Sequence, residues 1–165
     1  MNIKRIVKHL IMSERQVKSC FPADVLDFIE QEIKASETFH SGEIRFVVES
    51  ALEGAPLFKD QSARARAIDV FSQLRIWDTE QNNGVLIYML FADRDVEIIA
   101  DRGIHAKVGS ETWDKICHLM EGEFKQDNFK GGVTLGIKSI TQHLLTYFPI
   151  MPIDKNELSN KPVLI

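Results

Sequence analysis

The sequence has few of the residues, and none of the motifs, that would identify a reaction. Its 165 residues include only two cysteines, Cys20 and Cys117, which lie far apart and form no CxxC or other metal-ligand spacing. We therefore expect two free, buried thiols. The phosphate-binding patterns GxGxxG and P-loop are absent, as are the catalytic patterns HExxH and GxSxG. These absences exclude an assignment of function by motif.

Long apolar runs and an excess of positive charge are also absent. No run reaches the roughly 18 apolar residues that a transmembrane helix needs. Basic residues interrupt residues 3–12, which is not typical of the apolar region of a signal peptide, so we expect a cytoplasmic protein. A formal net charge of −4 argues against nucleic acid as the main partner, because binding to phosphates requires a concentrated basic surface.

What is present is the composition of a globular protein, with 44% hydrophobic and 27% charged residues. A chain of this length suits one domain with extensions at its ends. We predict an N-terminal amphipathic helix or extension at residues 1–20, a main domain at residues 21–148 and an extended tail at residues 149–165. Prolines at three positions keep the tail from forming a helix or a central strand, namely Pro149, Pro152 and Pro162.

The most informative stretch is the uniformly apolar run at residues 85–91, which follows the turn signal Asn82-Asn83-Gly84. A strand exposed on one face would alternate, so this run predicts a central strand covered on both faces. The acidic turn at residues 92–95 is too short for a crossover, so residues 96–100 should return antiparallel as a hairpin. Glu97 interrupts this second strand and places it nearer an edge of the sheet.

Helical and strand periodicities surround this hairpin. Residues 43–49 predict a first strand and residues 61–74 a helix, and this order implies a right-handed crossover to a parallel central strand. Further helices are predicted at residues 24–36, from residue 110 to Phe124, and at residues 133–148, with a loop at residues 127–132. The prediction is an α/β fold, a three-layer α/β/α sandwich with a small mixed central sheet flanked by helices on both faces.

The N-terminal helix, at residues 2–12, has a strongly apolar face. This face contains Ile3, Ile6, Val7, Leu10 and Ile11, while Lys4, Arg5 and Lys8 lie opposite. We expect the helix to dock through Ile6 and Leu10, either on the domain or on a second copy in a homo-oligomer. The alternative is a helix that lies on an anionic membrane surface.

Two groups of acidic residues are predicted at opposite ends of the sheet. The first group lies beyond the carboxyl ends of the parallel strands, where open α/β sheets usually bind ligands, and comprises Glu49, Ser50, Glu53, Asp93 and Asp95. Arg64 and Arg66 project from the early turns of the neighbouring helix. We expect both arginines to be exposed and to serve solubility.

The second group flanks the start of the central strand and the end of its hairpin partner. It comprises Asp78, Glu80, Asn82 and Asn83, facing Asp101, Arg102 and His105. Carboxylate and amide oxygens that converge are the ligands Ca²⁺ prefers, so we predict a Ca²⁺ or other divalent cation site formed by Asp78, Glu80, Asn83 and Asp101. No oxygen-ligand spacing such as DxDxDG supports it. The alternative is solvated loop charge that Arg102 neutralises.

The same residues resemble the TPM domain family, through residues 75–88, residues 92–98 and Asp101-Arg102-Gly103-Ile104. The family pattern has an asparagine-glycine before a central strand, a "D-R" hairpin and a glycine after the third strand. The resemblance extends from about Phe21 to Phe148 and implies a small α/β/α sandwich. The chain is most similar to bacterial members without a signal peptide or membrane anchor.

The resemblance implies divalent-cation binding or, from plastid members, acid phosphatase activity. We therefore expect a binding or auxiliary module with a protein partner. The second hypothesis is a metal-assisted phosphatase in which Asp78 or Asp101 is ligand or nucleophile, Arg102 holds phosphate and His105 is the general acid. A third hypothesis is a scaffold associated with a membrane surface.

Overall fold

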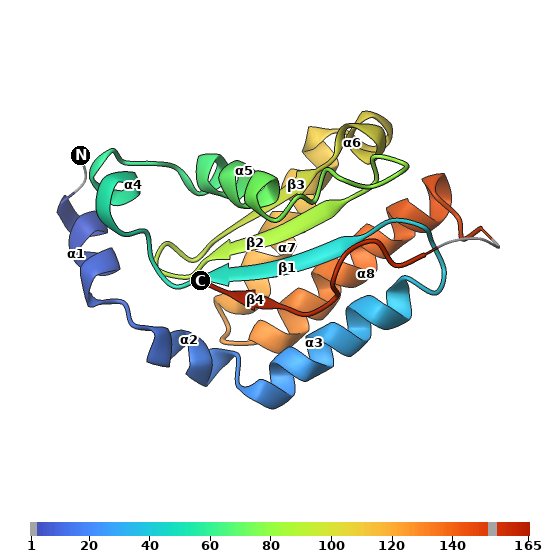
Figure 1. Cartoon of the computed structure of the whole chain (residues 1–165). Coiled ribbons are helices and arrows are strands. Elements are labelled where there is room, and N and C mark those ends of the chain that lie inside the picture. Colours follow the sequence, from blue (N-terminus) through green and yellow to red (C-terminus); the bar gives the residue numbers. More distant parts are fainter. Residues whose placement is uncertain (1–2, 152–154) are drawn as a thin grey trace.

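The computed structural model describes residues 3–151 and 155–165, in which a four-stranded sheet lies between layers of helices (Figure 1). The elements in chain order are α1 (Ile3–Ile11), α2 (Glu14–Cys20), α3 (Ala23–Ser36), β1 (Ile44–Glu49), α4 (Gly54–Phe58), α5 (Ala63–Gln73), β2 (Val85–Leu90), β3 (Asp95–Ala100), α6 (Arg102–Val108), α7 (Ser110–Phe124), α8 (Phe129–Tyr147) and β4 (Val163–Leu164).

The sheet has the strand order β3-β2-β1-β4. The β1 strand pairs in parallel with β2, and β2 pairs antiparallel with β3, which confirms the crossover and the hairpin predicted from the sequence. The β3 strand lies at an edge, as the interruption at Glu97 predicts. The opposite edge is β4, a strand in the C-terminal tail that the sequence did not predict. Two residues of β4 are too few for a recognisable alternating pattern.

The central strand β2 is buried along its whole length. All six side chains have a relative exposure of 0%, because helices cover both faces of the sheet. Val85, Ile87 and Met89 join the core beneath α3, α7 and α8, whereas the alternate residues of β2 join a second core beneath α5. Figure 1 shows α5 on one side of the sheet and α3, α7 and α8 on the other. The predicted α/β fold with helices on both faces is confirmed.

Several helix boundaries differ from the predictions for local reasons. Helix α8 begins at Phe129 inside the predicted loop, because the Asn128 side chain accepts a hydrogen bond from the backbone N of Gly131 and caps the helix. Helix α6 directly follows β3 and was not predicted. Cys117 is buried as expected, and burial raises the pKa of its thiol to about 12, whereas Cys20 is only half-buried.

Helix α1 docks in an orientation that only partly matches the prediction, since Ile6 packs against the core beneath α5 and Leu10 does not. Its Leu10 is 67% exposed and Ile6 is only partly buried, whereas His9 is 3% exposed. The prediction that Leu10 packs on the domain is therefore wrong, because Arg5 and His9 have polar partners there that are distant in the sequence. Asn2, at the start of the predicted helix, lies outside the described residues.

None of the helices in the described part of the chain is long and apolar enough to cross a membrane.

Candidate functional site

The four predicted cation ligands lie in two different environments near the start of β2. Asp78 and Glu80 are exposed on the loop that leads into β2, and the backbone N of Glu80 donates a hydrogen bond to the Glu157 carboxylate at 3.0 Å. Asn83 and Asp101 are buried. Across the described residues, no group of three or more His, Cys, Asp or Glu side chains is arranged to hold a metal ion. The cation site stays a prediction.

Asn83 links the start of β2 to the segment that precedes β1. Its side-chain Nδ2 donates to the backbone O of Ser41 at 2.8 Å, and its backbone N donates to the Thr79 hydroxyl at 3.1 Å. The side-chain Oδ1 is buried and has no hydrogen-bond partner in the described part of the chain. Asn83 therefore offers one acceptor oxygen to a water molecule or an ion.

Asp101 ends the hairpin and begins α6. Its backbone N donates to the O of Gly84 at 2.8 Å, and its Oδ1 accepts from the N of Arg102 at 2.7 Å, so the carboxylate caps the helix. Its second oxygen, Oδ2, is buried and has no hydrogen-bond partner within residues 3–151 and 155–165. Both buried members of the predicted site thus retain a free acceptor oxygen.

Most of the remaining family motif has a structural role. A side chain at Gly84 would place its Cβ 2.1 Å from the O of Ile76, and one at Gly103 would place it 2.5 Å from the O of Asn82. Asn82 has a φ of 52°, in the left-handed region that asparagine tolerates better than most residues, and its Oδ1 accepts from Arg102 Nε at 3.0 Å. The motif therefore builds the close contact between the loop before β2 and α6. The predicted convergence of these two segments is present.

The other acidic group, at the carboxyl ends of β1 and β2, has a different organisation. Glu49 is buried, and its carboxylate accepts two hydrogen bonds from Arg66 Nε, at 2.8 and 3.1 Å, and one from the Tyr88 hydroxyl at 2.7 Å. The prediction that Arg66 is exposed is wrong, because its side chain is 17% exposed and pairs with a buried carboxylate. The sequence contained a weak signal for this ion pair. Glu49 lies on the face of β1 that α5 covers, and Arg66 lies on the side of α5 that faces β1.

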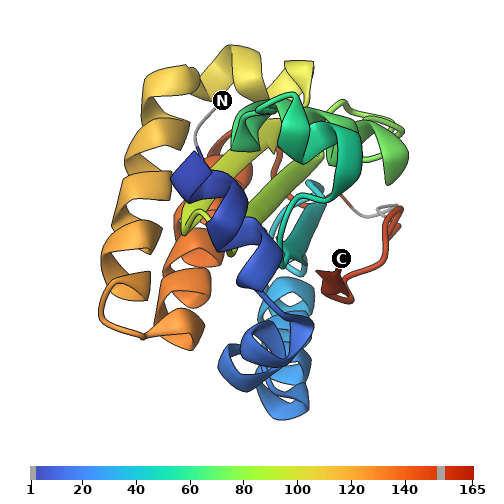
Figure 2. The same cartoon turned by 90° about the vertical axis from the view of Figure 1, so that its left-hand side faces the viewer.

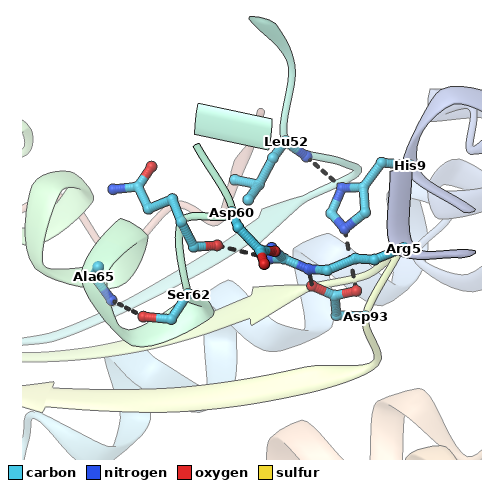
Figure 3. Close-up of polar contacts among 8 residues, drawn as sticks. Arg5, His9, Leu52, Asp60, Ser62, Ala65 and Asp93 are labelled. Carbon is cyan, nitrogen blue, oxygen red and sulfur yellow. Dashed lines mark hydrogen bonds and ion pairs between the residues drawn. The ribbon is translucent and has the colours of Figure 1, made fainter. Parts of the chain in front are cut away.

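Asp93, in the hairpin turn, is the partner of α1 (Figure 3). Its Oδ2 accepts from Arg5 Nε at 2.9 Å, and its Oδ1 lies 3.1 Å from His9 Nε2. His9 Nδ1 accepts a hydrogen bond from the backbone N of Leu52 at 2.8 Å, which leaves Nε2 to carry the ring hydrogen that faces Asp93. Arg5 also donates to Asp60 Oδ1 at 2.8 Å. The N-terminal helix thus neutralises part of this acidic group.

Two other carboxyl groups near the sheet have raised pKa values. Burial, together with Glu97, Glu121 and Asp93, raises the pKa of Asp95 to about 6. At the amino end of β1, burial raises the pKa of Glu37 to about 8 and the nearby Glu43 adds to the rise, against a lowering by the hydrogen bond from the N of Ile44. Glu37 is therefore largely protonated at neutral pH.

A cavity of about 370 Å³ adjoins the carboxyl end of β1, and Glu49, Ser50, Glu53 and Arg66 contribute to its lining. This is the position in which open α/β sheets usually bind ligands. Its buried carboxylate, Glu49, is already neutralised by Arg66, and the exposed Glu14 and Glu53 also line the cavity. Sequence reasoning placed Glu49, Ser50 and Glu53 at this end, and the structure places them there.

The comparisons with known proteins agree with the fold. Residues 19–143 match the TPM domain family. The NMR structure of the BA42 protein from the psychrophilic bacterium Bizionia argentinensis is 34% identical in sequence, with a TM-score of 0.76 over 87% of this chain and 94% of that chain. The NMR structure of the N-terminal domain of a protein from P. gingivalis, 18% identical, has a TM-score of 0.59 over 76% of this chain and 78% of that chain. No curated protein matches the sequence.

Proposed function

This chain belongs to the TPM domain family, and from that premise we propose that it is a binding module that holds a divalent cation at the start of β2 and assists a protein partner. Ca²⁺ is the first candidate for the cation. The observation that carries the proposal is the pair of buried acceptor oxygens, Asn83 Oδ1 and Asp101 Oδ2, that have no hydrogen-bond partner among the described residues. Buried acceptors without partners are uncommon and indicate an ordered water or ion.

The chemistry of the surrounding loop suits Ca²⁺. This ion takes about six to eight oxygen ligands at about 2.3–2.6 Å and tolerates irregular geometry. Asp78 and Glu80 are exposed on the adjoining loop and can supply carboxylates if the loop closes, while water completes the shell. Because the four side chains are not gathered around one point beforehand, we expect weak affinity and a movement of residues 77–84 on binding.

The guanidinium of Arg102 is the electrostatic argument against a cation, since its charge is fixed. Its Nε donates a hydrogen bond to Asn82 Oδ1 in the loop before β2, and Asn82 is not one of the proposed ligands. This hydrogen bond uses only Nε and leaves the Nη groups of Arg102 to act as donors, so it does not by itself separate cation binding from the metal-assisted phosphatase. No observation favours that second function, and we do not put it forward.

A calcium titration followed by backbone NMR shifts tests the proposal. We expect saturable shifts at residues 77–84 and 100–105, and Asp101→Asn should weaken them because the substitution removes the only buried carboxylate of the set. Glu53→Gln is the matched control, since it removes an exposed carboxylate at the opposite end of the sheet. Its titration should match that of the unmodified protein.

Two results would contradict the proposal. Shifts confined to residues 49–53 and 93–95 would move the site to the carboxyl ends of the parallel strands. Absence of any saturable shift at millimolar Ca²⁺ would leave Asp78 and Glu80 as solvated loop charge and the two buried oxygens as water ligands.

A further inference from the structure

Helix α1 is fixed to the domain by the polar side chains of Arg5 and His9 and by Ile6, which packs against the core beneath α5. Arg5 donates to Asp93 Oδ2 at 2.9 Å, to Asp60 Oδ1 at 2.8 Å and to the backbone O of Gln61 at 2.7 Å. One turn later His9 accepts from the N of Leu52 and lies 3.1 Å from Asp93 Oδ1. Figure 3 shows both side chains reaching from α1 towards Asp93. These contacts set the rotation of the helix about its own axis.

That rotation turns the aliphatic side of α1 outwards. The exposed fractions are 71% for Ile3, 50% for Val7, 67% for Leu10 and 73% for Ile11. A surface helix of a globular protein normally has the reverse orientation, with its apolar stripe on the core. Figures 1 and 2 show α1 at the outside of one end of the molecule, and none of the other helices and strands of the described residues covers its outer side. A contiguous exposed apolar face of this kind indicates an interaction surface.

The charges on α1 identify what this surface fits. Besides the four aliphatic residues, the exposed residues of the helix are Lys4 and Lys8, and the helix contains no acidic residue. We propose that α1 lies on an anionic lipid surface, with its aliphatic side chains at the boundary between headgroups and acyl chains and its lysines at the lipid phosphates. This surface is separate from the proposed cation site, and the inference does not depend on that site.

The neighbouring helix also exposes one apolar and one basic side chain at its end. Helix α4 packs beside α1, and its last residue, Phe58, is 59% exposed. Lys59 follows directly and is also exposed. An aromatic ring and a cation are the side chains that partition into the interface of an anionic bilayer.

A second copy of the chain fits this surface less well. Antiparallel pairing of two α1 helices through their aliphatic faces would bring Lys4 and Lys8 of both copies together without a carboxylate on either helix. At about 1.5 Å per residue, the helix is also only about 14 Å long. One face of it supplies a fraction of the roughly 800 Å² per partner that a stable interface buries. A lipid surface has no such size requirement.

Co-sedimentation of the full chain with lipid vesicles tests the inference. The probes are vesicles of phosphatidylcholine alone and vesicles that also contain phosphatidylserine. We expect binding to the anionic vesicles, weakened by added salt because the lysine contribution is screened. The double variant Val7→Ser/Leu10→Ser should bind at least about tenfold less, and Lys4→Glu/Lys8→Glu should lose the preference for anionic vesicles.

The matched control is Leu119→Ser/Leu145→Ser, which removes two exposed leucines from α7 and α8. It should bind vesicles as the unmodified chain does. All substituted side chains are exposed, so thermal unfolding should show each variant folded. Absence of binding, or equal binding by the Val7→Ser/Leu10→Ser variant, would overturn the inference. A concentration-dependent dimer that the same variant abolishes would overturn it too and assign the surface to a second copy.

Discussion

The two ends of the sheet hold buried polar groups in different states. At the carboxyl ends of β1 and β2, Glu49 is satisfied by Arg66 and Tyr88, and Asp93 is satisfied by α1. At the start of β2, Asn83 and Asp101 are buried like Glu49, yet each retains an acceptor oxygen without a partner among the described residues. The paired groups at the carboxyl ends stabilise the fold, whereas the unpaired oxygens at the start of β2 can act as ligands of a cation. The difference shows that burial of acidic residues alone does not identify a binding site.

The largest loss of stability is expected when a buried group at the carboxyl ends of β1 and β2 loses its partner. Arg66→Ala leaves the Glu49 carboxylate buried without its cation and should reduce the free energy of unfolding by about 3–5 kcal/mol. Arg64→Ala is the matched control on the same helix, because Arg64 pairs with Glu97 near the surface and its loss should cost less than about 1 kcal/mol. Urea denaturation measures both, and equal losses would contradict the distinction.

A smaller effect is expected from Glu37 at the amino end of β1. The unfolded carboxyl loses its proton near its usual pKa of 4.5, whereas the folded one keeps it up to a pKa of about 8. The folded protein therefore binds more protons between these values, and stability falls as pH rises, by up to about 1.4 kcal/mol per pH unit. Glu37→Gln should remove this loss and raise the free energy of unfolding at about pH 8 by about 1–3 kcal/mol.

Urea denaturation from about pH 5 to about pH 8 measures the slope for the Glu37→Gln protein and for an exposed control, Glu53→Gln. The control should keep the slope of the unmodified chain. Parallel profiles for the two variants would show that Glu37 ionises normally in the folded protein.

Tyr88→Phe tests the hydrogen bond to the buried carboxylate. The hydroxyl donates to Glu49 Oε2 at 2.7 Å, and a hydrogen bond to a charged group contributes about 1.5–3 kcal/mol. Because Arg66 remains, the expected loss in thermal or urea denaturation is smaller than that of Arg66→Ala. A neutral result would mean that water replaces the hydroxyl.

The smallest effect on stability is expected at the unsatisfied end. Asp101→Asn keeps an oxygen to cap α6, so without Ca²⁺ the free energy of unfolding should change by less than about 1 kcal/mol. Added Ca²⁺ should raise the melting temperature of the unmodified chain and not that of the variant, because only the former gains binding energy. Equal stabilisation of both proteins by Ca²⁺ would exclude Asp101 as a ligand.

Part of the candidate site could be predicted from the sequence. The hairpin predicted from residues 85–100 places Asn83 and Asp101 at one end of the sheet, because a short turn leaves an antiparallel return as the simplest path. The sequence could not show that Asp78 and Glu80 are exposed while Asn83 and Asp101 are buried, since exposure depends on the packing of the loop. It also missed the pairing of Glu49 with Arg66, which depends on how β1 and α5 face each other.

By itself the sequence determined the elements that follow from local periodicity, above all the buried strand β2, the hairpin with β3 and the helices with regular apolar stripes. Only the tertiary structure decided the orientation of α1 and the existence of β4. An amphipathic helix can dock by either side, and its polar side was selected by partners at Leu52, Asp60 and Asp93, far along the chain. A two-residue strand likewise exists only because the edge of β1 provides its hydrogen bonds.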